Sequence, residues 1–179
     1  TSRLERGALA LAELEELYLE WTESEEDSDF EDALREDIDA LGRDFRGTYF
    51  HASALSLLGR LEFSLDNFEE AAAAFSQSAD MQARHIAPVA LMNAAAAHEE
   101  AGNTETAAEI WTGVTQDYAD RSTEAPRALL NLARIAEAQS DYATAEELFN
   151  QIIDEYPNTD WTNLARNRII LLTAEGLLE

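Results

Sequence analysis

The chain has 179 residues, of which 37 are acidic and 12 are basic, and every basic residue is arginine, so the formal net charge is −25 at pH 7. This charge argues against binding to nucleic acid, which requires cations that neutralise phosphates, and against unaided binding to an anionic membrane surface. The chain has no cysteine, which excludes disulfides and thiol chemistry. Its length predicts one domain, residues 1–179. The acidic, lysine-free composition has two explanations, either adaptation to salt or genome bias, or a preference for basic partners.

Residues 1–47 predict two amphipathic helices separated by the acidic loop TESEEDSD. The apolar stripes of the two helices are Leu4, Leu11, Leu14, Leu17, Tyr18 and Trp21 in the first, and Phe30, Leu34, Ile38, Leu41 and Phe45 in the second. Ser28 and Glu31 have the spacing of a capping box at the start of the second helix. The loop contains Asp27 and Asp29 but lacks the glycine and the final glutamate of a calcium-binding EF-hand loop, so we expect a solvated loop.

The middle of the chain repeats one spacing of residues three times, at distances of 36 and 38 residues. In each copy a small residue is followed twelve positions later by an alanine, and an aromatic residue follows four positions after that. The three copies are Gly59, Ala71 and Phe75; Ala95, Ala107 and Trp111; and Ala133, Ala145 and Phe149. Small side chains let two helix backbones approach, so we expect each aromatic side chain to pack over the small residue of the preceding helix.

Turn residues separate the two helices of each copy and predict where the second helix begins. Asn67, Asn103 and Asp141 stand at these turns as expected N-caps. Short insertions are expected near residues 80–87 and 116–125. Beyond Pro157, Thr159 is the expected cap of a last helix, whose apolar face would carry Trp161, Leu164, Ile169 and Leu172.

Residues 50–157 resemble the tetratricopeptide repeat (TPR) in the order of their residue types. This order is a large apolar residue, a small residue, an aromatic turn residue, alanine, an aromatic residue and a closing proline, which here stands in YPN. The second copy departs from this pattern at Thr104, where an aromatic is usual. The resemblance implies an all-α, TPR-type α-solenoid of antiparallel helix pairs with about nine helices. Residues 1–47 would be a degenerate N-terminal pair, and residues 158–179 a capping helix.

Two longer stretches are similar to narrower families of bacterial envelope proteins. GTYFHASALSLLGR, after an acidic helical pair, resembles the YfgM-like ancillary subunits of the Sec translocon, while EYPNTDWTNLARNRI is similar to periplasmic TPR proteins of the Tol-Pal and outer-membrane-assembly systems. The first resemblance implies the periplasmic part of a membrane-anchored protein on the periplasmic side of the inner membrane. No run of 18 apolar residues is present, so the membrane would be reached only through an N-terminal anchor missing from this sequence.

No group of residues has the pattern of a catalytic site. The chain lacks a G-x-S-x-G nucleophile motif and a glycine-rich phosphate loop. His98 begins HEEAG, which lacks the second histidine of a zinc-binding H-E-x-x-H helix, and we expect His98 to be a packing residue. We therefore expect no enzymatic activity, no cofactor and no metal site.

The resemblance to TPR proteins implies a concave peptide-binding groove lined by the first helix of each pair. The groove residues would be Ser56, Arg60, Phe63, Met92, Asn93, Glu99, Arg127, Leu130, Asn131 and Arg134. Asn93 and Arg127 match two positions of the clamp with which some TPR proteins hold a C-terminal carboxylate. The arginines could instead form ion pairs with neighbouring glutamates within the chain.

These observations predict a non-catalytic adaptor that binds a protein or an extended peptide, with its oligomeric state left open. On the YfgM-like resemblance it would help secreted chains to leave the translocon. The alternatives are an envelope scaffold of the Tol-Pal or outer-membrane-assembly type, a self-associating TPR protein, and a binder of small ligands.

Overall fold

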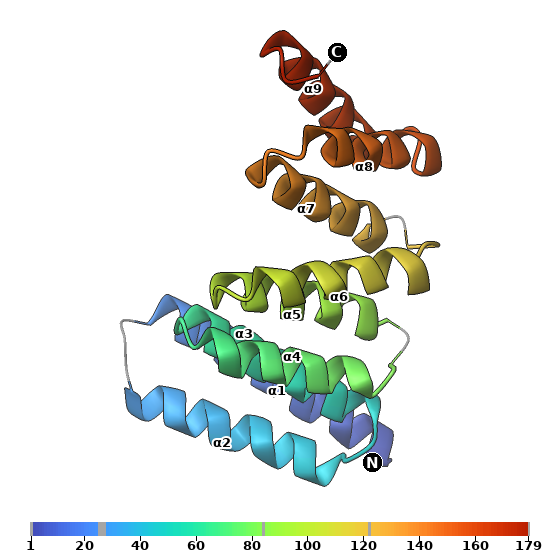
Figure 1. The fold of residues 1–179 in the computed structure, drawn as a ribbon. Coiled ribbons are helices and arrows are strands. Elements are labelled where there is room, and N and C mark those ends of the chain that lie inside the picture. The colour runs from blue at the N-terminus through green and yellow to red at the C-terminus, as the bar shows by residue number, and fades with distance from the viewer. Residues whose placement is uncertain (1, 25–27, 84, 122, 179) are drawn as a thin grey trace. The chain divides into compact units, whose positions relative to one another are not determined.

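The computed structural model describes residues 2–24, 28–83, 85–121 and 123–178, and in these residues nine α-helices follow one another along the chain (Figure 1). The all-α fold that the sequence predicts is thus confirmed. The contacts divide the chain into two compact units, Thr1–Gly102 and Asn103–Glu179.

The first unit contains five helices that pack in sequence order. They are α1 (Arg3–Glu23), α2 (Ser28–Asp44), α3 (Tyr49–Ser64), α4 (Phe68–Asp80) and α5 (Ala87–Glu100). Helix α3 packs against α1, α2 and α4, and α5 packs against α4. Each helix of the N-terminal pair thus buries a face against the first repeat.

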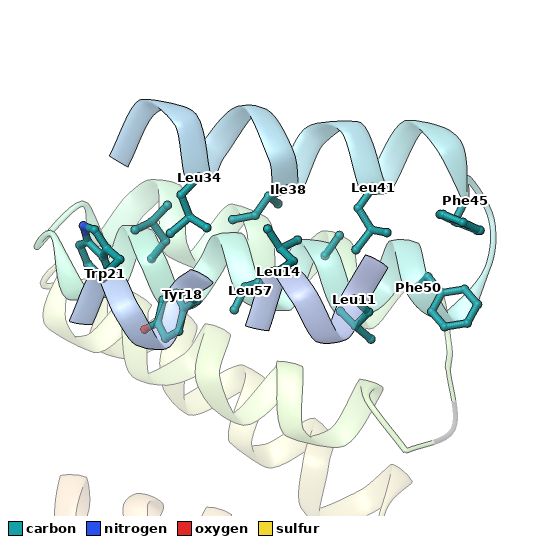
Figure 2. Packing of buried hydrophobic residues seen from close by; sticks show 12 residues of the cluster. Leu11, Leu14, Tyr18, Trp21, Leu34, Ile38, Leu41, Phe45, Phe50 and Leu57 are labelled. Atoms are coloured by element: carbon teal, nitrogen blue, oxygen red, sulfur yellow. The ribbon is translucent and has the colours of Figure 1, made fainter. Parts of the chain in front are cut away.

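The core of the N-terminal pair lies between α1, α2 and α3. Figure 2 shows the side chains of α2 pointing from one side into a layer formed by α1 and α3. The predicted stripes supply most of this core, which includes Leu14, Tyr18 and Trp21 of α1 and Leu34 of α2. The prediction is wrong for Leu4, whose side chain is 72% exposed near the start of α1.

The packing of α3 against α4 depends on the absence of a side chain at Gly59. A Cβ atom at this position would lie 2.7 Å from Cδ1 of Phe75, where real Cβ atoms essentially never occur. Ala71 and Phe75 are both buried in α4. The expected contact between a small residue and an aromatic ring is therefore confirmed in the first repeat.

The second unit contains four helices: α6 (Thr104–Asp117), α7 (Glu124–Ala138), α8 (Tyr142–Glu155) and α9 (Asp160–Ala174). Helix α7 packs against α6 and α8, and α9 packs mainly against α8. Ala133, Ala145 and Phe149 belong to one buried cluster, as the repeat spacing predicts. The residues of the second copy, Ala95 on α5 and Ala107 on α6, belong to different units, so their contact stays a prediction.

The predicted N-caps occupy the expected positions, but only some use their side chains. Asp141 and Thr159 each accept a hydrogen bond from the backbone N–H three residues later, which confirms them as caps. Asn67 and Asn103 precede α4 and α6 but make no side-chain cap bond. The Asn67 amide instead donates to Oε2 of Glu62 at 2.8 Å, a charge-assisted hydrogen bond that joins this side chain to α3.

Polar contacts hold the end of the second unit together. The Tyr156 hydroxyl donates to the Ala119 carbonyl at 2.9 Å and so links the ends of α8 and α6. The guanidinium of Arg168 on α9 donates to both carboxylate oxygens of Glu137 on α7. The apolar face predicted for α9 is wrong at Leu164, which is 49% exposed, because Ala165 and Leu172 form the buried side instead.

Two expectations lie outside the described residues. Asp27 belongs to the segment 25–27, and the side chain of Ser28 is not described either, so the calcium and capping-box interpretations stay untested.

Within the described helices, none is both long and apolar enough to cross a bilayer.

Candidate peptide-binding surface

Helix α3 contributes the first three residues of the expected groove, and each has a neighbour within the first unit. The guanidinium carbon of Arg60 lies 4.4 Å from the ring centroid of Tyr18 on α1, although Arg60 itself is exposed. The Ser56 and Ser78 hydroxyl oxygens are 2.8 Å apart. The ring of Phe63 meets that of Phe68 edge-on, with centroids 5.2 Å apart. Arg60 is therefore the most accessible of the three.

Helix α5 carries the next three expected residues. Asn93 and Glu99 are half-buried and reach the surface. Met92 is only 2% exposed, so in this conformation its thioether fills the core and offers almost no surface to a ligand. This part of the expected surface is thus polar rather than mixed.

Helix α7 contributes the four residues of the second unit. Arg127 and Arg134 are exposed, while Leu130 and Asn131 are half-buried. Arg127 follows Pro126 in the first turn of the helix, and Arg134 follows two turns later. The exposed side of α7 therefore joins two guanidinium groups to an amide and an aliphatic side chain, a combination suited to carboxylate and apolar groups of a peptide.

Arg60 tests the alternative that the groove arginines are ion-paired within the chain. The Arg60 guanidinium contacts the ring of Tyr18 in a cation–π interaction, which leaves the edge of the guanidinium group free to donate hydrogen bonds. The sequence did not single out Tyr18 for this role, because nothing in the periodicity of residues 1–47 indicates which part of α1 lies beside α3. Tyr18 itself is buried, so it positions Arg60 and adds no accessible side chain to this surface.

A second polar group that the sequence did not indicate lies where α2, α3 and the following turn meet. Glu62 is only 7% exposed, and its carboxylate accepts hydrogen bonds from Nε of Arg35 at 2.7 Å and from the Asn67 amide. Burial alone would raise the pKa of Glu62, but the hydrogen bonds from Arg35 and Asn67, with the charge of Arg35, hold this pKa below its ordinary value. These hydrogen bonds link α2 of the N-terminal pair to α3 of the first repeat.

The described residues contain no gathering of three histidine, aspartate or glutamate side chains that could hold a metal ion. The side chain of His98 is half-buried, and its Nδ1 atom is buried with no hydrogen-bond partner in the described part of the chain.

Comparison with family models identifies the repeats. One model described as tetratricopeptide repeat matches residues 89–121 and 127–159, and a second with the same description matches residues 25–84. Together these matches span more than half of the chain, which therefore belongs to the tetratricopeptide repeat family. The second match reaches further toward the N-terminus than the sequence pattern indicated and includes α2. No curated protein matched the chain.

Proposed function

We propose that this tetratricopeptide repeat protein is a non-catalytic adaptor that binds another protein or an extended peptide. The binding residues are exposed ones on α3 and α5 of the first unit and, separately, on α7 of the second unit. TPR proteins generally bind proteins or peptides, and the family match supports that general role here. The observation that carries the proposal is the exposure of arginine on the first helix of a pair in both units, at Arg60 and at Arg127. Guanidinium groups donate two parallel hydrogen bonds to carboxylates, which peptides offer at side chains and at the C-terminus.

The cellular setting is a further proposal, based on the resemblance of residues 47–60 to YfgM-like proteins. In that setting the chain is the periplasmic part of a membrane-anchored protein beside the Sec translocon, where it would bind secreted chains as they emerge. A surface that is acidic overall and carries a few exposed arginines suits transient contacts, because charge complementarity increases association rates more than affinity.

Copurification tests both the proposed binding residues and the proposed cellular setting. The full-length protein is isolated from detergent-solubilised membranes of its source, as wild type and as the triple variant Arg60→Ala, Arg127→Ala and Arg134→Ala. The control is Arg166→Ala, which removes an exposed arginine from α9. We expect translocon subunits and secreted chains with the wild type and the control, and loss of the secreted chains with the triple variant. Wild-type protein without translocon subunits would refute the setting, and full retention by the triple variant would refute the binding residues.

A further inference from the structure

An open crevice of about 310 Å³ lies between α2, α3 and α4 of the first unit and includes none of the residues of the proposed peptide-binding surface. The half-buried side chains of Leu55 and Leu58 on α3 form an apolar part of its floor. Its rim carries Arg43 and Arg46, which stand one turn apart around the end of α2. The crevice thus joins an apolar floor to a rim with two positive charges, in a chain whose net charge is −25.

The two rim arginines are not engaged by the protein's own carboxylates. Arg35 and Arg168 form ion pairs with Glu62 and Glu137, whereas within the described residues Arg43 and Arg46 make neither an ion pair nor a hydrogen bond. A chain with 37 acidic residues could readily neutralise every exposed arginine. Two unpaired guanidinium groups on one crevice are therefore available to an external acceptor.

His51, in the first turn of α3, adds a third donor to this rim. The backbone N–H of Gly47 donates to Nδ1 of His51 at 3.4 Å, so the neutral imidazole carries its proton on Nε2. The ring lies against Gly42, where a Cβ atom would come within 3.1 Å of Cδ2 of His51. The lack of a side chain at Gly42 therefore leaves room for the imidazole, whose Nε2–H is the donor.

We propose that this crevice is a second docking site, which binds a short acidic and apolar segment of a partner protein: carboxylates on Arg43 and Arg46, and an aliphatic side chain over Leu55 and Leu58. The charge of the whole chain favours this occupant. A membrane surface or a nucleic acid presents many negative charges at once to a protein of net charge −25 and is repelled. One or two carboxylates interact locally, within a Debye length of about 8 Å at physiological salt. Asp39, also on the rim, limits the number of carboxylates that the crevice accepts.

Fluorescence anisotropy with a defined probe tests the site. The probe is an end-blocked tetrapeptide that alternates glutamate with leucine and carries an uncharged fluorophore, and its matched control replaces each glutamate with glutamine. The purified chain is titrated as wild type and as Arg43→Gln, Arg46→Gln and their double variant. Arg166→Gln removes the same charge from an exposed position on α9. Circular dichroism confirms that each variant is folded, which we expect because all three arginines are exposed.

We expect each rim substitution to weaken binding of the glutamate peptide about tenfold, the worth of one charge-assisted contact, while Arg166→Gln leaves it within about twofold because that charge is remote and screened. The variant Gly42→Ala keeps every charge but displaces His51, and it should weaken binding severalfold. Equal binding by the glutamine peptide, or unchanged binding by the double variant, would overturn the proposal. Binding to phosphatidylglycerol vesicles without binding to the peptide would also overturn it, in favour of a membrane. Because Arg60, Arg127 and Arg134 are intact in these proteins, failure here is separate from failure of the proposed adaptor surface.

Discussion

The contact between Gly59 and Phe75 gives the sharpest prediction about stability. Replacing a glycine inside a helix with alanine normally stabilises the folded state by about 1 kcal/mol through helix propensity. At Gly59, however, the new Cβ would lie 2.7–2.8 Å from three ring carbons of Phe75, so the ring or the backbone must move. Overpacking of this kind costs about 1–3 kcal/mol. We therefore expect Gly59→Ala to be destabilising by up to about 2 kcal/mol.

Gly113 on α6 supplies the matched control, because a Cβ atom there meets nothing within 4 Å. Gly113→Ala should stabilise the protein by about 0.4–1 kcal/mol. Urea unfolding followed by circular dichroism at 222 nm measures both variants, and Phe75→Leu in the Gly59→Ala background should restore part of the loss by making room. Equal stabilisation by Gly59→Ala and Gly113→Ala would refute the close approach of α3 and α4.

Three further predictions concern packing, pH and salt. Ala71→Leu should overpack the same helix pair and lower the free energy of unfolding by about 1–3 kcal/mol, and an unchanged urea midpoint would argue against close packing there. Glu62→Gln should cost about 1–3 kcal/mol at pH 7, because Arg35 and Asn67 lose an ionised partner. Since the pKa of Glu62 is lowered in the folded state, its contribution is complete above the unfolded pKa and is lost as pH falls through the folded pKa. The difference between wild type and Glu62→Gln should thus shrink below about pH 4 in thermal melts, and a constant difference would contradict the assignment. If the acidic composition reflects adaptation to salt, the melting temperature should rise with salt concentration as self-repulsion is screened, whereas a melting temperature independent of salt would favour a preference for basic partners.

The repeat could be predicted from the sequence because its main contacts are local and recur. Gly59 and Phe75 are sixteen residues apart, as are Ala133 and Phe149, so one spacing read three times indicates both the helix pair and the contact within it. Helix starts followed from the same spacing, since Asn67, Asn103 and Asp141 each occupy the N-cap position. These features depend on short-range steric demands that few sequences satisfy.

The side-chain partners could not be predicted in the same way. Arg35 finds Glu62 and Arg168 finds Glu137 across 27 and 31 residues, and in a chain with 37 acidic residues no pattern singles out either partner. Asn67 is likewise not a side-chain cap, and its amide donates instead to the Glu62 carboxylate, a partner that the spacing of the repeat does not indicate. Leu4 and Leu164 fit an apolar stripe but lie toward solvent, because periodicity defines a helix face only to within a residue or two at the ends.

The segment that contains Arg43, Arg46 and His51 has an unusual charge composition, which an analysis of helical periodicity does not reveal. GRDFRGTYFH contains two arginines and a histidine with a single acidic residue, an unusual stretch in a chain with three acidic residues for each basic one. Charge patterning would have marked this segment, but only the packing of α2, α3 and α4 shows that it borders a crevice with an apolar floor.

Proton NMR of the native protein tests most directly whether neighbouring helices meet through small residues. The ring of Phe75 lies against the backbone of Gly59 in the structure, so the Gly59 α-protons should show strong cross-relaxation to the ring protons of Phe75 and shifts displaced by the ring current. A Cβ atom at Gly113 would meet nothing within 4 Å, so the Gly113 α-protons should show neither effect. Ordinary helical shifts at Gly59, with no cross-peak to Phe75, would contradict the packing on which this account of the fold depends.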